Sequence, residues 1–370
     1  MEDYRNKYFD NACTSFPKPT EVGEAMLKHL NEGGSYGRAA YDRIIDSSRV
    51  VEETRDKLGS FIGTKQFSNI VFDYNATSAI NKILSGFSFK HKTVLVSPLE
   101  HNAVMRPLTL LGINVGILPH NKDGYIAVEQ ISPSMIENVD MVIVNHISNV
   151  NGVVQPISQL KEVFSGTPLL VDASQSLGKV EVFADEWNID FVAFTGHKGL
   201  LGPTGTGGFY VKNPDALKAT VVGGTGSNSA SFEMPNYMPD KFQAGTPNIT
   251  GIYGLQAALN NIPKNSWDWP TLHSILNELK QNPKIRVLCA EDYMFQSDVF
   301  SISPYNEDVS GFAYKLYNEY GIQVRSGLHC SPLAHKTLGT FPKGSVRFSL
   351  SPYHTNNDLE FLQSCITNAI

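Results

Sequence analysis

Residues 191–211 read FVAFTGHKGLLGPTGTGGFYV, an apolar run that leads into Lys198 and then into a glycine-rich stretch. The run before the lysine predicts a buried strand, and 207–211 predicts a second one. Lysine is among the residues least often buried, so a lysine at the end of a buried strand is unusual. Burial lowers the pKa of an amine and favours its neutral, nucleophilic form. Lys198 is therefore a candidate catalytic residue, although a lysine that surfaces at a strand–loop junction explains this motif alone equally well.

The glycines of this segment do not form either of two common phosphate-binding motifs. A P-loop needs lysine after its second glycine; Gly202 and Gly207 have the right spacing, but Gly208 follows them. A dinucleotide-binding fingerprint opens a helix, whereas residues 205–208 run into a strand-like segment. We expect these glycines to form a tight turn in which the backbone can approach a ligand.

The chain on both sides of this segment alternates strand and helix patterns. Most of the strand candidates are apolar on both faces, which is typical of a mostly parallel sheet covered by helices. Seven strands are predicted at 68–72, 93–97, 114–118, 141–146, 169–173, 191–194 and 207–211. Helices are predicted between them at 76–85, 102–111, 157–164 and 180–187. The pattern predicts an α/β domain with a mostly parallel seven-stranded sheet.

A different texture begins near residue 251 and indicates a smaller α+β domain. Its predicted helices are 251–261, 272–281 and 357–367, and its predicted strands are 286–289, 299–303 and 345–350. We expect a large domain over 16–250 and a small domain formed by 1–15 and 251–370. A chain of 370 residues is long enough for more than one core.

Composition excludes several classes of protein. The net charge of −6 gives no electrostatic reason to expect a nucleic-acid partner. The four cysteines include no CxxC pair, so neither a metal site nor a disulfide framework is expected, and scattered thiols fit a reducing compartment. The first ten residues lack the apolar core of a secretory signal, and no apolar run is long enough to span a membrane. We expect a cytoplasmic protein.

Asp172, in PLLVDASQS, also follows an apolar strand. Parallel sheets bind ligands at the carboxyl ends of their strands, where Asp172 and Lys198 are both expected. An acidic residue there can pair with a protonated pyridine nitrogen of pyridoxal phosphate (PLP). A carboxylate that caps the next helix is the structural alternative for Asp172 alone.

Several motifs occur together in one order. They are FDNACTS, EHNA, HISNVNG, VDASQS, FTGHKGLLGPTGTG, QAGTPN, RSGLHC and SVRFSLSPYHT. This set resembles the class V aminotransferase family within fold type I of PLP-dependent enzymes, the aspartate aminotransferase-like fold. The resemblance is greatest to the cysteine desulfurase and selenocysteine lyase branch and covers nearly the whole chain.

The resemblance implies a role for each matching residue. Lys198 would bind PLP covalently, Asp172 would hold the pyridinium nitrogen, Gln175 would bond the ring 3-oxygen and His101 would stack on the ring. The phosphate would contact residues from three segments, namely Ala76 and Thr77, Thr195 and His197, and Thr246 of a second subunit in a homodimer. Asn149 would lie near the substrate and the ring oxygen, and Ala12 near the substrate carboxylate. Ala76 stands where the family often has a hydroxyl residue, which removes one phosphate contact.

The resemblance further suggests sulfur chemistry at RSGLHC. Arg325 is the expected partner of the substrate carboxylate, because a guanidinium binds two oxygens at once. Cys330 is the expected nucleophile toward the sulfur of L-cysteine, and His329 is expected to lower the thiol's pKa or relay a proton. A surface ion pair for Arg325 and a small buried residue for Cys330 are the structural alternatives. Of the other cysteines, Cys13 is expected to border the pocket, and Cys289 and Cys365 to lie in the core.

The reaction implied is a cysteine desulfurase reaction: L-cysteine becomes L-alanine, Cys330 carries the sulfur as a persulfide, and a partner thiol, such as that of a sulfur-acceptor protein, collects it. Three alternatives stay open. They are a selenocysteine lyase, a family member acting on a different amino acid, and a catalytically silent protein that keeps the fold.

Overall fold

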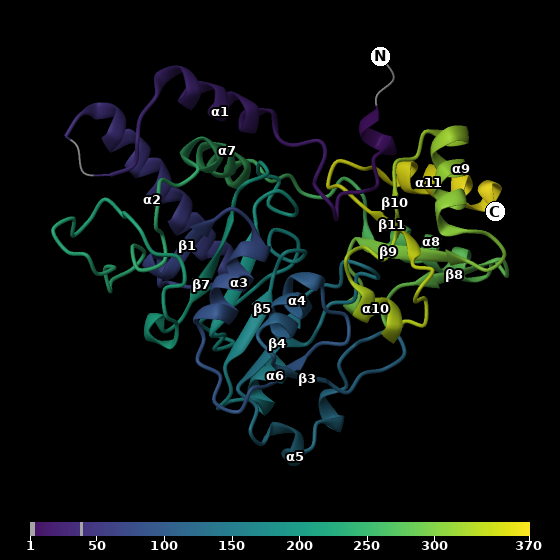
Figure 1. Ribbon diagram of the computed structural model, residues 1–370. Helices are drawn as coiled ribbons and strands as arrows, with labels where there is room; N and C mark the ends of the chain where they lie inside the picture. The colour runs from purple at the N-terminus through teal and green to yellow at the C-terminus, as the bar shows by residue number, and fades with distance from the viewer. Residues whose placement is uncertain (1–3, 38–39) are drawn as a thin grey trace.

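The structure, a computed structural model, describes residues 4–37 and 40–370. Its larger part contains a seven-stranded sheet with the strand order β1-β7-β6-β5-β4-β2-β3 (Figure 1). β7 is antiparallel to both of its neighbours, and the other paired strands are parallel. The strands are β1 (Ile70–Asp73), β2 (Thr93–Val96), β3 (Asn114–Ile117), β4 (Met141–Asn145), β5 (Leu169–Asp172), β6 (Phe191–Thr195) and β7 (Gly207–Val211). The predicted seven-stranded, mostly parallel sheet is confirmed.

Helices cover both faces of this sheet, which explains why its strands read as continuous apolar runs. Alternate residues face opposite sides: Val94 packs with α3 and α4, whereas its neighbour Leu95 packs in the core shared with α2, α6 and α7. The helices of this part are α1 (Thr20–Glu32), α2 (Asp42–Ile62), α3 (Ala76–Gly86), α4 (Asn102–Leu110), α5 (Pro133–Ile136), α6 (Ile157–Val163) and α7 (Ile249–Asn260).

The helix predicted over 180–187 is wrong. This segment forms turns: two of its central backbone N–H groups bond to the end of α2, and the helical bond from Trp187 to Phe183 is not continued into a regular helix. Ala184 donates to the carbonyl of Ile62 at 2.9 Å, and Asp185 donates to that of Gly63 at 3.0 Å. The apolar spacing that suggested a helix comes from side chains such as Val182, which is buried against this helix end.

The second part has a four-stranded antiparallel sheet ordered β10-β11-β9-β8. Its strands are β8 (Ile285–Leu288), β9 (Val299–Pro304), β10 (Arg325–Gly327) and β11 (Ser345–Ser349), and its helices are α8 (Trp269–Lys280), α9 (Val309–Tyr320), α10 (Pro332–Thr337) and α11 (Asn356–Ala369). Short 3₁₀ helices are η1 (Tyr4–Lys7), η2 (Phe67–Asn69), η3 (Val128–Gln130), η4 (Pro214–Ala216) and η5 (Tyr293–Phe295). The predicted smaller α+β unit is present.

The chain start joins this second part: Phe9 lies in its core, and η1 lies beside it in Figure 1. The apolar residues of α7, among them Leu255 and Leu259, instead belong to the core of the large sheet. The division at 250/251 stays a prediction, and the packing of α7 favours a boundary after that helix.

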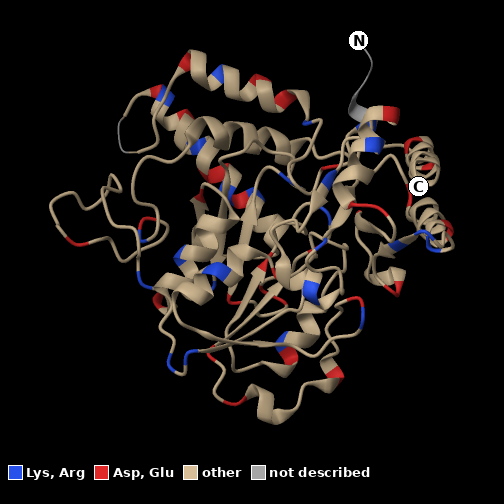
Figure 2. Ribbon diagram, turned by 45° about the vertical axis from the view of Figure 1, so that its right-hand side comes forward, with Lys and Arg blue, Asp and Glu red and all other residues tan. Residues whose placement is uncertain are grey.

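The surface agrees with the composition. Figure 2 shows acidic and basic residues mixed along the outer helices. Within residues 4–37 and 40–370, no helix is both long and apolar enough to cross a membrane.

Candidate active site

The turn after β6 carries Lys198. All five residues of β6 are buried, and the strand ends at Thr195. Gly196 continues the ladder with a 2.8 Å bond from its N–H to the carbonyl of Thr206, and a Cβ on Gly196 would lie 2.2 Å from the Thr206 hydroxyl. The glycine-rich segment is thus a tight turn whose strands approach closely, as expected.

A cavity opens at the carboxyl ends of the parallel strands. Nine of the thirteen predicted site residues line it: Ala76, Thr77, His101, Asn149, Asp172, Gln175, Thr195, His197 and Lys198. The other four, Ala12, Thr246, Arg325 and Cys330, are not among its lining residues. Residues that the sequence assigned to one site, from five separate segments of the chain, therefore line the same cavity.

Asp172 and Lys198 act on each other within this cavity. Asp172 is the last residue of β5, and its Oδ1 accepts hydrogen bonds from the backbone and the hydroxyl of Ser174. Burial lowers the pKa of Lys198 to about 8, while the charge of Asp172 opposes this shift. A substantial fraction of neutral amine is thus available near neutral pH, which is the form that attacks a carbonyl.

His101 is neutral and its ring is oriented. The residue is the N-cap of α4, and its Nδ1 accepts a 3.0 Å hydrogen bond from the N–H of Ala103. The proton of the neutral ring is therefore on Nε2. Burial and then the charge of Lys198 lower the pKa of His101 to about 4.

One end of the cavity suits an anion. Asn75 caps α3, and the N–H groups of Ala76 and Thr77 in its first turn have no partner within the helix. Two buried polar atoms across the cavity, Thr195 Oγ1 and His197 Nδ1, make no hydrogen bond. Free donors together with the positive end of a helix dipole favour a phosphate group.

Several residues of the N-terminal segment 10–15 contact the site. Of these, the sequence predicted only Ala12 and Cys13 near the pocket. The carbonyl of Ala12 accepts a 2.9 Å bond from Gln175 Nε2, which leaves Gln175 Oε1 buried in the cavity without a partner. Ser15 N–H and the Thr14 hydroxyl donate to the carbonyl of His197, at 2.9 and 3.2 Å. These bonds hold the lysine turn.

Two arginines lie close to this segment. Arg325 Nη1 donates to the sulfur of Cys13 at 3.3 Å, and Arg347 Nη2 donates to Asp10 Oδ1 at 2.6 Å. Arg347 is almost completely buried, and its Nε has no partner. Both guanidinium groups lower the pKa of His101, so both lie near the cavity. Arg347 was not among the predicted site residues, because the strand-like stretch SVRFSLSPYHT does not indicate that its arginine side chain is buried.

Cys330 is exposed on a loop held at both ends. Asn149 Nδ2 donates to the carbonyl of His329 at 2.9 Å, and the hydroxyl of Ser331 donates to Asn149 Oδ1 at 2.8 Å. His329 and Cys330 both have left-handed backbones, with φ of 50° and 57°, a strained conformation for such residues. The structural alternative of a buried Cys330 is excluded, whereas Cys289 and Cys365 are buried as expected.

Of the two roles expected of His329, lowering the thiol's pKa by its charge is not supported. Its Nε2 lies 3.0 Å from the carbonyl of Ser345, and burial lowers its pKa well below the ordinary value. A neutral, buried imidazole cannot stabilise a thiolate by charge, whereas the role of proton relay stays a prediction.

Thr246 is exposed and lies away from the cavity, beside Gly205 and Asp73. Within one chain it therefore makes no contact with the predicted phosphate site. Its predicted role belongs to a second subunit and stays a prediction.

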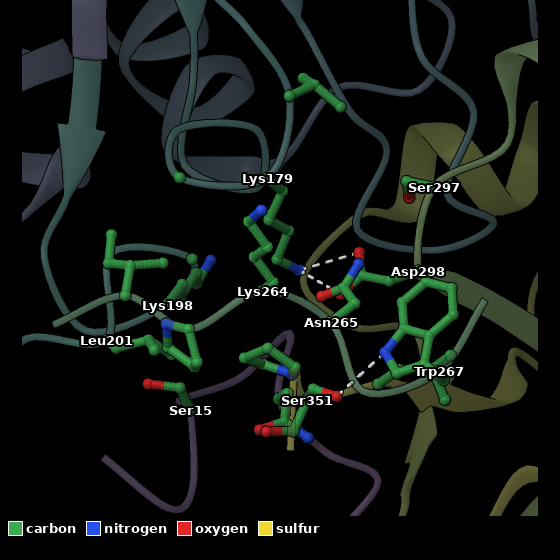
Figure 3. Close-up of a pocket in the computed structure, with 18 of the residues that line it drawn as sticks. Ser15, Lys179, Lys198, Leu201, Lys264, Asn265, Trp267, Ser297, Asp298 and Ser351 are labelled. Carbon is green, nitrogen blue, oxygen red and sulfur yellow. Dashed lines mark hydrogen bonds and ion pairs between the residues drawn. The ribbon is translucent and has the colours of Figure 1, made fainter. Parts of the chain in front are cut away.

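A second, larger cavity reaches Lys198 from the groove between the two parts of the chain. Figure 3 shows Lys198 on one side of it and Trp267 and Asp298 on the other, with Lys179 reaching across to Asp298. Lys179 Nζ lies 2.7 Å from the carboxylate of Asp298, an ion pair that joins the two parts. The lysine turn thus lies between two cavities.

Known proteins resemble this chain over nearly its whole length. Residues 7–362 match the family described as Aminotransferase class-V. A probable cysteine desulfurase from Methanothermobacter thermautotrophicus is 32% identical over 96% of this chain and 92% of its own length. A cysteine desulfurase from Escherichia coli is 28% identical, with 96% and 91% covered.

Solved structures extend the likeness to the fold. An apo cysteine desulfurase from Thermococcus onnurineus superposes with a TM-score of 0.88 at 27% identity, over 98% of this chain and 94% of that one. The cysteine desulfurase CsdA from Escherichia coli gives 0.84 at 26%, over 100% and 95%. The chain has the fold of type I PLP enzymes, and it belongs to the class V aminotransferase family.

Proposed function

We propose that this chain is a PLP-dependent cysteine desulfurase that converts L-cysteine to L-alanine and takes the sulfur onto Cys330. The observation that carries the proposal is the single cavity that joins an amine of lowered pKa, Lys198, to the carboxylate of Asp172 and to an anion-binding helix end. The relatives named cysteine desulfurase, which match nearly the whole chain, support it.

The residues present fit the cofactor. Thr195 Oγ1 and His197 Nδ1 are buried beside the cavity without a partner, and such atoms are costly unless a ligand or water satisfies them. Thr195, His197, Ala76 and Thr77 would hold the phosphate, and Asp172 the ring nitrogen. Gln175 would meet the ring oxygen through the second proton of its amide, since the first is bonded to Ala12.

Bound at Lys198, PLP would withdraw electrons from the bonds at the substrate's Cα. With the cofactor bound, the Lys198 amine would remove the substrate's Cα proton and later return a proton to carbon, because its pKa of about 8 suits both directions. His101 acts as a neutral ring against the cofactor with Nε2–H as its donor.

Two guanidinium groups are available for the substrate carboxylate. We assign it to Arg325, which is only partly buried and whose bond to Cys13 is a weak one to sulfur. Arg347 is the alternative, because it is deeper and has an unpaired Nε.

The sulfur step belongs to Cys330. Its thiolate attacks the substrate sulfur; an S–S bond forms, the Cβ–S bond breaks, and the electron pair remains on the carbon skeleton that becomes alanine. Because Cys330 is exposed, the persulfide can be reached by an acceptor thiol of a small molecule or of another protein.

The test is to incubate the holoprotein with L-cysteine and a reductant and to measure sulfide and alanine. The wild-type protein should release sulfide and alanine in equal amounts and carry a persulfide on Cys330. Lys198→Ala should form neither product, and Cys330→Ala should carry no persulfide. Alanine without sulfide, or unchanged sulfide release by Cys330→Ala, would contradict the assignment. L-selenocysteine as a competing substrate separates the lyase alternative: a strong preference for it would move the function there.

We further propose a homodimer in which Thr246 of each subunit completes the phosphate site of the other. The exposure of Thr246 beside the turn of Gly205 supports this arrangement.

A further inference from the structure

Glu100 is a fully buried carboxyl group that the proposed mechanism leaves without a role. It directly precedes His101, and its Oε1 accepts a 2.7 Å bond from the N–H of Asn145 at the end of β4. Asn145 lines the cavity and is paired in register with Asp172 on β5. Glu100 thus lies behind two elements that carry predicted cofactor contacts, the His101 turn and the strand end beside Asp172.

The hydrogen bonds around Ser97 require an additional proton. Ser97 Oγ lies 2.6 Å from Asn145 Oδ1 and 2.8 Å from Glu100 Oε1. Its hydroxyl has one proton and can donate to only one of these two oxygens. The Asn145 amide cannot be turned to supply the second proton, because its Nδ2 donates to the carbonyl of Leu99 at 2.8 Å. The proton between Ser97 and Glu100 must therefore come from the carboxyl group.

The surroundings disfavour an ionised Glu100. Ser97, Glu100 and Asn145 are all buried, and Glu100 Oε2 makes no hydrogen bond of ordinary geometry. Burial and then the negative charge of Asp172 raise the pKa of Glu100 to about 8, although the nearby Ser97 hydroxyl and the backbone N–H groups of Asn145 and His101 act in the opposite direction. An unpaired buried carboxylate is costly, and protonation is the usual escape.

We propose that Glu100 is a neutral carboxylic acid whose proton bridges to Ser97, and that this bridge is a positioning element which fixes Asn145 and the His101 turn beside Asp172. Its importance for the cofactor rests on the proposed function. If Glu100 is neutral, Asp172 is the carboxylate that faces the ring nitrogen, and Glu100 adds no second negative charge nearby.

Infrared difference spectroscopy tests the protonation state directly. The spectrum of wild type minus Glu100→Gln, recorded near neutral pH, should contain the carbonyl stretch of a protonated carboxylic acid. The matched control Glu24→Gln removes an exposed carboxyl group and should contain carboxylate bands instead. Carboxylate bands in the Glu100→Gln difference would overturn the proposal.

The holoprotein offers a second readout, the pH midpoint of the visible absorption band of the lysine-bound cofactor. The charged groups that act on this region are Lys198, Asp172, Arg325 and Arg347. If Glu100 is neutral, Glu100→Gln removes no charge and leaves the midpoint unchanged. If Glu100 is ionised, the midpoint should fall by roughly one pH unit or more, and the proposal fails.

Glu100→Ala tests the positioning role. It leaves a gap behind His101 and should weaken cofactor retention on dialysis at least 10-fold relative to Glu100→Gln. Equal retention by the two variants would reject that role. A chain that binds no PLP at all would refute the proposed function, while the infrared test on the cofactor-free protein would still decide the state of Glu100.

Discussion

The backbone N–H of Asn102 donates a 2.8 Å hydrogen bond to the carbonyl oxygen of Cys330. Asn102 is the first residue of α4 and directly follows His101, so the loop of the proposed nucleophile is attached to the turn of the histidine that is predicted to stack on the cofactor. Asn149 holds the other side of the loop through His329 and Ser331. The Cys330 thiol is exposed, but its backbone is fixed on both sides.

Ser331→Ala should slow sulfur transfer without affecting the cofactor. The change removes the 2.8 Å bond to Asn149 Oδ1 and a longer contact with the carbonyl of His329; the loss of about 1 kcal/mol should slow persulfide formation roughly 3- to 10-fold. Single-turnover mass spectrometry of the Cys330 persulfide measures this rate. Ser134→Ala, at an exposed serine far along the chain, is the control. A parallel loss of the cofactor absorption band would mean that the loop supports the cofactor site instead.

Arg325→Lys should raise KM for L-cysteine more than it lowers kcat. A lysine cannot bind both carboxylate oxygens, and hydrogen bonds to a charged group are worth about 1.5–3 kcal/mol, which corresponds to roughly 10- to 150-fold in KM. Steady-state kinetics checks the split. Cys13→Ser removes the sulfur partner of Arg325 and should leave KM within about 3-fold.

Arg347→Lys separates the two arginines. Because Arg347 is buried and paired with Asp10, its replacement should lower the melting temperature of the cofactor-free protein, which Arg325→Lys should not do. If instead Arg347→Lys raised KM at an unchanged melting temperature and Arg325→Lys did not, the carboxylate would belong to Arg347.

The sequence predicted the sheet well because its strands are buried on both faces. A strand such as β6 is apolar at every position, and the residue that breaks the pattern, Lys198, lies where such sheets bind ligands. The helix at 180–187 could not be excluded in the same way, since its backbone partners belong to α2, more than a hundred residues away.

The site residues that the sequence missed are those defined by tertiary contacts. Nothing in the order of residues indicates that Ser15 bonds the lysine turn, or that Glu100 and Asn145 share a buried network. The charge that His329 was expected to offer the thiol is missing for the same reason: this histidine, adjacent to the cysteine in the sequence, is buried against Ser345, which favours its neutral form. Burial decides ionisation, and burial is a property of the fold.

Lys198→Met should stabilise the cofactor-free protein near neutral pH. Burial lowers the pKa of Lys198 from about 10.5 to about 8, so the folded state holds its proton less tightly than the unfolded state. This disfavours folding below pH 8 by up to about 3 kcal/mol, and the effect disappears as pH rises from 8 to 10.5. Denaturant unfolding at pH 7 and pH 10 measures both ends. A stability difference that did not shrink with pH would mean that packing, and not charge, is responsible.

Mixed dimers test whether Thr246 acts across subunits. Thr246→Asp places a carboxylate against the predicted phosphate and should abolish activity by repulsion, and Lys198→Ala abolishes it by removing the amine. If Thr246 serves the partner's site, a dimer of one chain of each kind has one intact site, formed by Lys198 of the first chain and Thr246 of the second. Random reassociation of equal amounts makes half of the dimers mixed, so about a quarter of the wild-type sites should work.

Mixing without exchange of subunits is the control and should restore no activity. Each homodimer is inactive on its own, so recovery requires a shared site, whereas a site formed within one chain predicts no activity at any mixing ratio.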